Sequence, residues 1–272
     1  TQYSVEFRQT GLDLTASGAV VTINGSTTLG YADLPNTMWV NNGSLITYSY
    51  GNVSSSTSGK RFTLTGVTGP SSPLTITSAT TITGNYQIQY QVTFDQTGVS
   101  SDFTGTVVTI DTVDHSVSKL PTTPQFWWDQ GSSHTFSFAS PLVVNGGGKQ
   151  YMWSSTSGLS NMQGTTLTIT TSGNLAGNYV VQDTVTFDQV GVDPDFTGTV
   201  VTIDGVNYTR TQLPASFPWT LNSVHNFTFQ SPLVGGANTK QYVWISTTGL
   251  SKQQNGAITV TTDGIAVGND KT

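Results

Sequence analysis

The stretch Tyr86-Gln-Ile88-Gln-Tyr90-Gln-Val92-Thr-Phe94 alternates apolar or aromatic side chains with polar ones throughout. This period of two is typical of a β-strand that buries one face. At about 3.3 Å per residue the strand would be about 30 Å long, which exceeds most strands. It joins two copies of a repeated unit without a linker, and the same element recurs at residues 179–187. The sequence therefore predicts strands that finish one domain and begin the next.

The repeat rests on landmarks that occur three times in the same order. Phe-x-Gln-x-Gly begins at Phe7, Phe94 and Phe187. Each copy is followed by Val-Val-Thr-Ile, Leu-Pro, an aromatic cluster, a lysine shortly before an aromatic residue, and Gly-Asn. Ordered self-similarity with a period of about 90 residues indicates tandem domains. We predict β-sandwich repeats at residues 1–87, 88–181 and 182–272, the third of which lacks its closing strand.

Composition fits this division. Only 9% of the 272 residues are charged, and short alternating runs are separated by Gly, Pro, Asn and Ser clusters. Such segments favour strands and turns over helices. Units of about 90 residues with about seven strands match an immunoglobulin-like sandwich. We therefore predict an all-β chain of three tandem immunoglobulin-like β-sandwich domains joined by continuous strands. The chain has no cysteine, so aromatic cores must stabilise the domains without disulfides.

Charge and hydropathy exclude two classes of partner. A formal net charge of −6 argues against nucleic acid. No apolar run approaches the roughly 18 residues that a membrane span requires. Thr1 is not methionine, which fits numbering after removal of a leader. N-glycosylation sequons occur at Asn24, Asn42, Asn52, Asn207 and Asn226. We expect an extracellular or cell-surface location with N-linked glycans, although a Ser/Thr-rich chain also forms sequons by chance.

A further resemblance follows from the order of motifs. Tyr-x-Val-x-Phe-x-Gln-x-Gly, Val-Val-Thr-Ile-Asp-Gly-Val, Leu-Pro, Lys-Gln-Tyr-x-Trp, Ser-Gly-Leu-Ser and Gly-Asn-Tyr resemble repeats in archaeal cell-surface proteins, including S-layer-associated and thermopsin-linked proteins. The resemblance covers the whole chain. It implies an extracellular structural role and brings no catalytic residues with it.

Candidate catalytic and metal-binding residues are sparse. His134 and His225 occupy equivalent positions, but no His-x-His pair or cysteine accompanies them, so we interpret them as surface strand positions rather than zinc ligands. Two aspartate pairs near turns could contribute to a calcium site, although turn residues are the simpler interpretation: Asp111 with Asp114, and Asp193 with Asp195. No nucleophile and base form a set. We therefore predict no enzymatic activity and no cofactor beyond this calcium alternative.

Two recurring features allow a second interpretation. A lysine (Lys60, Lys149, Lys240) and an asparagine (Asn85, Asn178, Asn269) recur in every repeat, which is the pairing that an isopeptide cross-link uses. The alternative is a lysine whose stem packs on aromatic neighbours.

The aromatic clusters align Trp39, Trp128 and Trp219 as a recurring core residue. The additional Trp127 would then lie at the surface, where it could stack on a sugar ring.

The two ends of the sequence look like two halves of one junction. After Gly268 and Asn269 the sequence reads Asp270-Lys-Thr, and the chain opens with Thr1-Gln-Tyr3-Ser-Val-Glu-Phe7. Joined in a second copy, they would restore the spacing of an internal junction to within one residue. We therefore expect head-to-tail association by strand addition through Thr1, Gln2, Tyr3, Val5, Phe7, Gly268, Asn269 and Asp270.

These observations favour a structural subunit of an extracellular filament or surface layer, which polymerises head-to-tail through its termini. The alternative is an adhesion or carbohydrate-binding module of a secreted protein.

Overall fold

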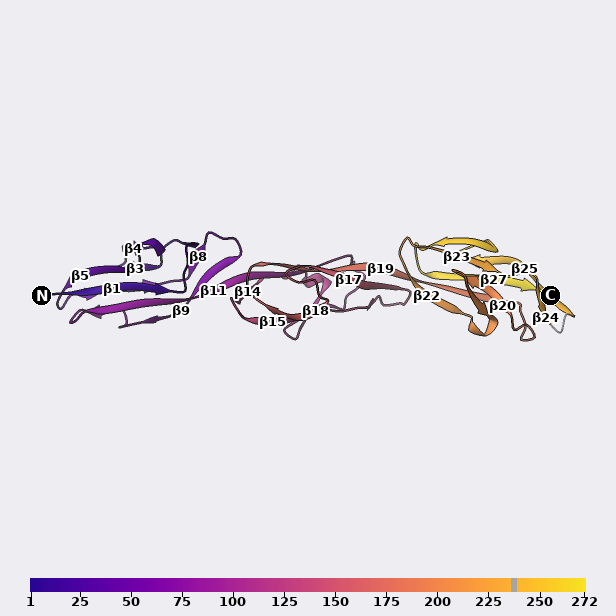
Figure 1. Ribbon diagram of the computed structural model, residues 1–272, viewed down its shortest axis with the longest axis horizontal. Coiled ribbons are helices and arrows are strands. Elements are labelled where there is room, and N and C mark those ends of the chain that lie inside the picture. The colour runs from indigo at the N-terminus through magenta and orange to yellow at the C-terminus, as the bar shows by residue number, and fades with distance from the viewer. Residues whose placement is uncertain (236–238) are drawn as a thin grey trace.

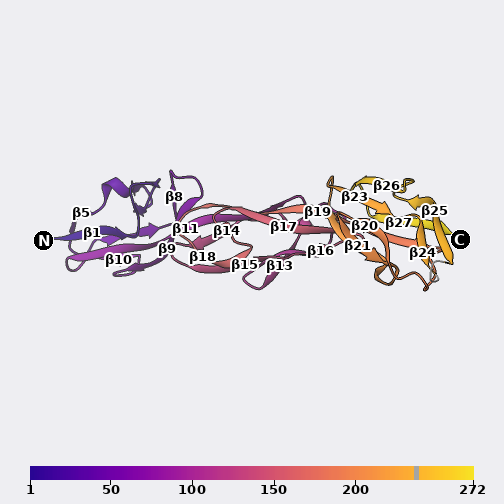
Figure 2. The same cartoon turned by 45° about the vertical axis from the view of Figure 1, so that its right-hand side comes forward.

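The computed structural model describes residues 1–235 and 239–272. The chain forms an elongated rod of β-strands, with the N- and C-terminal ends at opposite ends of the long axis (Figure 1). A view turned by 45° shows the same arrangement (Figure 2). The strands belong to several separate sheets, and 3₁₀ turns are the helical elements within the described residues. The prediction of an all-β, multi-domain sandwich fold is confirmed.

Elements up to the first long strand are β1 (Gln2–Thr10), β2 (Ala16–Ser17), β3 (Val21–Ile23), β4 (Thr27–Leu29), η1 (Tyr31–Asp33), β5 (Asn36–Asn41), β6 (Leu45–Ile46), β7 (Tyr48–Tyr50), β8 (Val53–Ser55), β9 (Lys60–Thr68), β10 (Leu74–Thr75) and β11 (Thr80–Thr97).

The middle of the chain contains β12 (Thr106–Ile110), β13 (Val113–Ser116), η2 (Val117–Lys119), β14 (Phe126–Asp129), β15 (Ser133–Phe138), β16 (Leu142–Val143), β17 (Lys149–Gly158), β18 (Gly164–Thr168) and β19 (Gly173–Val190).

The last third contains β20 (Thr199–Ile203), β21 (Val206–Thr209), η3 (Arg210–Gln212), β22 (Ala215–Thr220), β23 (Val224–Phe229), β24 (Leu233–Gly235), β25 (Lys240–Gly249), β26 (Asn255–Thr259) and β27 (Gly264–Lys271).

The strands β11 and β19 are each 18 residues long, or about 60 Å at 3.3 Å per residue. The first part of β11 pairs in parallel with β1 and its last part pairs in parallel with β19. In the same way, β19 pairs first with β11 and then with β27. One strand thus closes one sandwich and opens the next. The repeat limits after residues 87 and 181 fall inside these strands and stay a prediction.

One expectation about the third repeat needs correction. The closing strand, predicted to be missing, is present as β27, which pairs in parallel with β19 and antiparallel with β25. The pairing of β25 with β27 ends at Val243 and Lys271. In the second repeat, the equivalent pairing of β17 with β19 continues for three more residue pairs and ends at Lys149 and Asp183. The third sandwich is therefore closed along most of its length. The asparagine landmark marks the middle of the closing strand and not its end.

Core residues come from the same landmarks in each third of the chain. The Val-Val-Thr-Ile landmark contributes three buried side chains each time: Val20, Val21, Ile23; Val107, Val108, Ile110; Val200, Val201, Ile203. Most of them pack in one cluster with the phenylalanine that starts Phe-x-Gln-x-Gly. Val20 and Val200 belong instead to smaller clusters that contain Tyr86 and Tyr242. Burial of aromatic surface is the main stabilising contribution in such a cysteine-free sandwich.

The Phe-x-Gln-x-Gly landmark turns the chain beside the closing strand. In the second repeat the Gln96 side chain accepts a hydrogen bond from the Val99 amide at 2.9 Å. Gly98 has a φ of +92°, and the space of a side chain at Gly98 is taken by the Tyr179 carbonyl oxygen. Gly11 and Gly191 make the same approach to residues 86 and 270. Glycine is therefore needed for both its conformation and its size.

A side chain at Gly98 should be costly for two separate reasons. Gly98→Ala forces alanine into a left-handed conformation, at about 1–2 kcal/mol, and also pushes a methyl group against the Tyr179 carbonyl. Gly131→Ala is the matched control, because Gly131 has a φ of +83° but open space around it. We expect the unfolding midpoint to fall further for Gly98→Ala than for Gly131→Ala. If thermal and guanidinium unfolding showed the same loss of stability for the two variants, the close approach at Gly98 would have no cost.

Candidate functional site: the junctions between repeats

The backbone at each junction is held from both sides. At the first junction the Gln91 amide donates to the Gly59 carbonyl of the preceding repeat at 2.8 Å. The Gln130 amide of the following repeat donates to the Ile88 carbonyl, also at 2.8 Å. Strand β9 of one repeat and β14 of the next thus lie along opposite edges of β11. Two sandwiches share one strand, and this arrangement restricts bending at the junction.

Side chains extend this contact across the outer face of the first junction. The Arg61 Nε donates to Gln89 Oε1 at 2.8 Å, and Gln89 Nε2 donates to Asp129 Oδ1 at 2.8 Å. The Arg61 guanidinium also lies 4.3 Å from the centre of the Trp127 ring. A guanidinium over an indole is a favourable cation–π arrangement. Arg61 belongs to the preceding repeat, and Asp129 and Trp127 belong to the following one, so this cluster crosses the junction.

At the second junction, two amides occupy the positions of Arg61 and Gln89. Gln150 Nε2 donates to Gln182 Oε1 at 2.9 Å. Asp183 is buried there beside Lys149. Burial raises the pKa of Asp183, and the charge of Lys149 partly offsets the increase.

The N-terminal end of the rod, here called the head face (Thr1, Gln2, Trp39, Asn41 and Asn42), repeats the geometry of a junction. The Asn42 amide donates to the Thr1 carbonyl at 3.0 Å, as Gln130 does to Ile88. Gln2 Nε2 donates to Asn41 Oδ1 at 3.2 Å, as Gln89 does to Asp129. Trp39 occupies the register position of Trp127 and is 67% exposed.

The predicted interface residues at this end divide into two groups. Val5 and Phe7 are fully buried, and Tyr3 packs against the same core cluster of the first repeat. These three side chains pack inside the first repeat, where they hold β1 in position. The accessible surface is left to Thr1 and Gln2.

The C-terminal end of the rod, here called the tail face (β25 at Lys240–Tyr242 together with the end of β27), contains the other predicted residues. Gly268 is buried against the Phe229 ring, and Asn269 Nδ2 donates to the carbonyls of Ser246 and Val267. Lys240–Tyr242 pairs with β24 on one side. Within the described residues, this segment has no strand on the side that β27 occupies further along.

Asp270 replaces a tyrosine at the tail face. At the equivalent position, the Tyr86 hydroxyl donates to the Gly51 carbonyl at 3.1 Å and that of Tyr179 to the Ala139 carbonyl at 2.9 Å. Asp270 is 8% exposed, and its Oδ1 has no hydrogen-bond partner among the described residues. Burial raises the pKa of this carboxyl to about 6, because desolvation disfavours the charged form.

The recurring lysines contact aspartates and not the recurring asparagines. Lys60 lies 2.5 Å from Asp13, Lys149 lies 2.8 Å from Asp102, and Lys240 bonds Asp193; each pair is separated by 47 residues. Each ammonium also lies 4.7–5.0 Å from the centre of an aromatic ring. The asparagines bond elsewhere, for example Asn178 to Thr97. The interpretation of Lys and Asn as an isopeptide pair is therefore wrong, because the two side chains do not meet.

The histidines are more enclosed than the sequence indicated. His134 stacks on Trp128 with ring centres 3.8 Å apart, and its two nitrogens lie 2.5 Å from Asp111 Oδ2 and 3.0 Å from Ser132 Oγ. His225 repeats this arrangement on Trp219. The Ser132 hydroxyl donates to the Asp129 carbonyl. The serine proton is therefore directed at a backbone carbonyl and not at the imidazole, whereas a nucleophile needs its hydroxyl proton directed at the base.

Metal-binding geometry is not found where the sequence allowed it. The four candidate aspartates have other partners: Asp111 with His134, Asp114 with Thr109, Asp193 with Lys240, and Asp195 with Tyr242. In the part of the chain that the structure describes, no group of three or more His, Cys, Asp or Glu side chains could hold a metal ion.

The tryptophan alignment from the sequence is wrong for the first repeat. Register with β1 places Val40, and not Trp39, at the position of Trp128. The predicted sugar platform at Trp127 is covered by Arg61.

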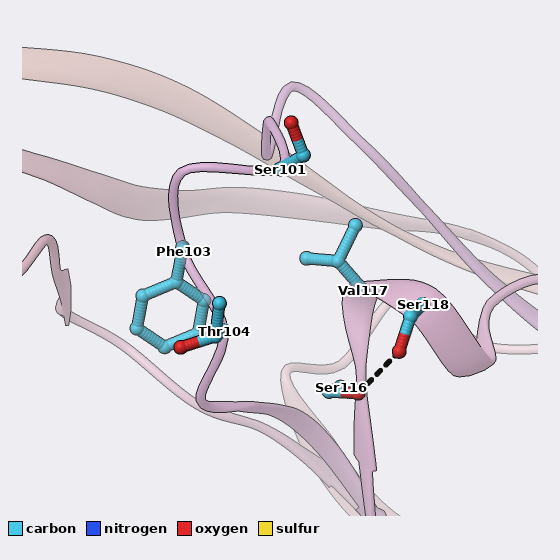
Figure 3. Close-up of a pocket in the computed structure, with 6 residues that line it drawn as sticks. All are labelled: Ser101, Phe103, Thr104, Ser116, Val117 and Ser118. Carbon is cyan, nitrogen blue, oxygen red and sulfur yellow. Dashed lines mark hydrogen bonds between the residues drawn. The ribbon is translucent and has the colours of Figure 1, made fainter.

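A cavity of about 310 Å³, lined by Arg8, Gln9, Leu34 and Pro35, is at the lower limit of typical ligand pockets. Another of about 160 Å³ is lined by Phe103, Thr104, Val117 and three serines, and Figure 3 shows Ser116 and Ser118 hydrogen-bonded to each other at its edge. Its volume is about half the lower limit of typical ligand pockets.

All five predicted glycosylation sites are exposed. Three of the asparagines use their side-chain oxygen locally, for example Asn52 with the Leu64 amide. Among residues 1–235 and 239–272, no helix has the length and apolarity to cross a membrane.

No protein-family model matches this chain, and no curated protein matches it. Among solved structures it is similar to the TIE protein of Bacillus anthracis, with a TM-score of 0.28 and 10% identity over 99% of this chain and 50% of that one. It is also similar to the pilus adhesin SpaC of Lactobacillus rhamnosus GG, with a TM-score of 0.27 and 12% identity over 100% of this chain and 43% of that one. The match to BcpA, the major pilin subunit of Bacillus cereus, has a TM-score of 0.28 and 8% identity over 99% of both chains. The chain spans about half the length of the first of these. Such low scores carry no argument about function, which therefore rests on the junctions.

The buried carboxyl of Asp270 should make stability depend on pH. Its folded pKa of about 6 lies above the ordinary value of 3.8, so the folded state binds more protons between these values. Stability from this group is present below pH 4 and is lost as pH rises through about 6. Asp270→Asn should flatten the decline of the thermal midpoint between pH 4 and 7. An Asp270→Asn slope equal to that of the native chain would contradict this assignment.

Proposed function

We propose that this protein is a structural subunit of an extracellular filament or surface layer, and that it polymerises head-to-tail through its termini by strand complementation. The observation that carries the proposal is the repetition of junction geometry at the head face. The hydrogen bonds of Asn42 to Thr1 and of Gln2 to Asn41 match those on the β14 side of the first junction.

The tail face supplies a complementary edge. By the register of the internal junctions, Lys240, Gln241 and Tyr242 would pair with Tyr3, Gln2 and Thr1 of a second copy. The main-chain groups of an unpaired edge favour the addition of a strand. The strand added here is short, so most of the contact is end-to-end packing that resembles an internal junction.

The shape of the molecule supports a filament. The head and tail faces lie at opposite ends of a rod (Figure 1), so contact between them is heterologous. Such a contact repeats without closing into a small ring. A uniform string of repeats with a spacing of about 90 residues would result.

The extracellular location and N-linked glycans belong to the same proposal. They are supported by the exposure of all five sequons, by the low charge of the chain and by the resemblance to archaeal surface repeats. The adhesion alternative is less favoured, because Arg61 covers the Trp127 platform on which it rested.

A proline at Gln2 tests the proposal without disturbing the core. The Thr1 carbonyl faces β5, so the Gln2 amide faces the opposite edge, where the second copy would pair. Gln2→Pro removes this donor, whereas Gln2→Ala keeps it. We expect concentration-dependent fibres by electron microscopy for the native chain, fibres of reduced stability for Gln2→Ala, and monomers for Gln2→Pro. Light scattering that reports a folded monomer for the native chain at every concentration would overturn the proposal.

A further inference from the structure

Trp39 is exposed at a position where the first internal junction covers a tryptophan. It lies on the outer face of β5, beside the bonded pair Gln2 and Asn41. At the equivalent place Trp127 lies beside the bonded pair Gln89 and Asp129, and Arg61 of the preceding repeat covers its ring. A tryptophan that is 67% exposed on an otherwise polar face indicates a contact surface.

The residue that would cover Trp39 in a fibre follows from the register. Arg61 pairs with Gln89 across the first junction, and Gln150 pairs with Gln182 across the second. Because Gln241 lies at the equivalent position of β25, it would meet Gln2 of a second copy. Its amide can bond Gln2, as Gln150 bonds Gln182 at 2.9 Å, and its planar group can lie over Trp39.

We propose that Trp39 is the anchor of the joint between subunits, and that Gln241 of a second copy of this chain covers its ring. This inference rests on the proposed head-to-tail assembly and adds the residues that determine which surfaces meet. Asn41 and Gln2 hold the neighbouring amide in place, as Asp129 and Gln89 do inside the chain. Glutamine in place of arginine makes the joint between subunits weaker than the internal junction.

A double-mutant cycle tests the contact. Gln241→Arg recreates the pairing of Arg61 with Trp127 and should lower the critical concentration for polymerisation about two- to fivefold, which corresponds to an exposed cation–π contact. Trp39→Ala should raise the critical concentration. In the Trp39→Ala background, Gln241→Arg should lose its effect, because the ring is missing. Sedimentation of fibres across a concentration series measures all four chains.

Gln150→Arg is the matched control. It introduces the same charge at the equivalent position of the second junction, where Pro218 replaces the tryptophan, and should leave the critical concentration unchanged. If the native chain polymerises but Trp39 and Gln241 show no coupling, the Trp39 joint is overturned while head-to-tail assembly stands. If the native chain stays monomeric, both proposals fail. Binding of glycans that is lost in Trp39→Ala, without any change in polymerisation, would assign the ring to adhesion and overturn the joint.

Discussion

The parallel pairing between the opening and closing strands of each repeat is the constraint on which the structure depends. Strand β11 pairs with β1 before the first junction and with β19 after it. Because one uninterrupted strand satisfies both pairings, neighbouring sandwiches are coupled through a backbone ladder rather than a flexible linker. The glycine of Phe-x-Gln-x-Gly makes this possible, since it lets the turn after each opening strand approach the closing strand. An elongated rod follows directly from this arrangement.

The junctions then combine a fixed backbone with variable side chains. The bond from the amide after β14 to the Ile88 carbonyl recurs between Leu221 and Val181 and between Asn42 and Thr1. The outer-face partners differ, with Arg61 over Trp127 at one junction and paired glutamines at the other. A scaffold of this kind can tune the strength of each junction without changing its geometry. A joint between subunits built on the same scaffold would need only a compatible pair of outer-face residues.

Polar groups in this chain mostly stabilise the repeats. The lysine–aspartate pairs hold the loop after the opening strand against the strand that pairs with the closing one. The histidines stack on tryptophans and hold the turn after β12 or β20 through an aspartate. Partly exposed ion pairs such as those of Lys149 and Lys240 contribute little each. Their recurrence at the same spacing indicates that they set loop geometry. Asp270 is the exception, because it is buried at the position where the other repeats use tyrosine.

Strand patterning and repeat order could be predicted from the sequence, because side-chain alternation and recurring landmarks are local properties of the chain. They indicated the all-β class and the strands that continue from one repeat into the next. Partners across sheets could not be predicted, because they depend on register between strands that are distant in sequence. The strand register places Trp39 at the surface and not in the core. The folded sheets also bring the lysines to aspartates and not to asparagines, and they close the third sandwich with β27. The patterns along the chain thus define which faces are buried, and only the folded sheets decide which residues meet at a junction.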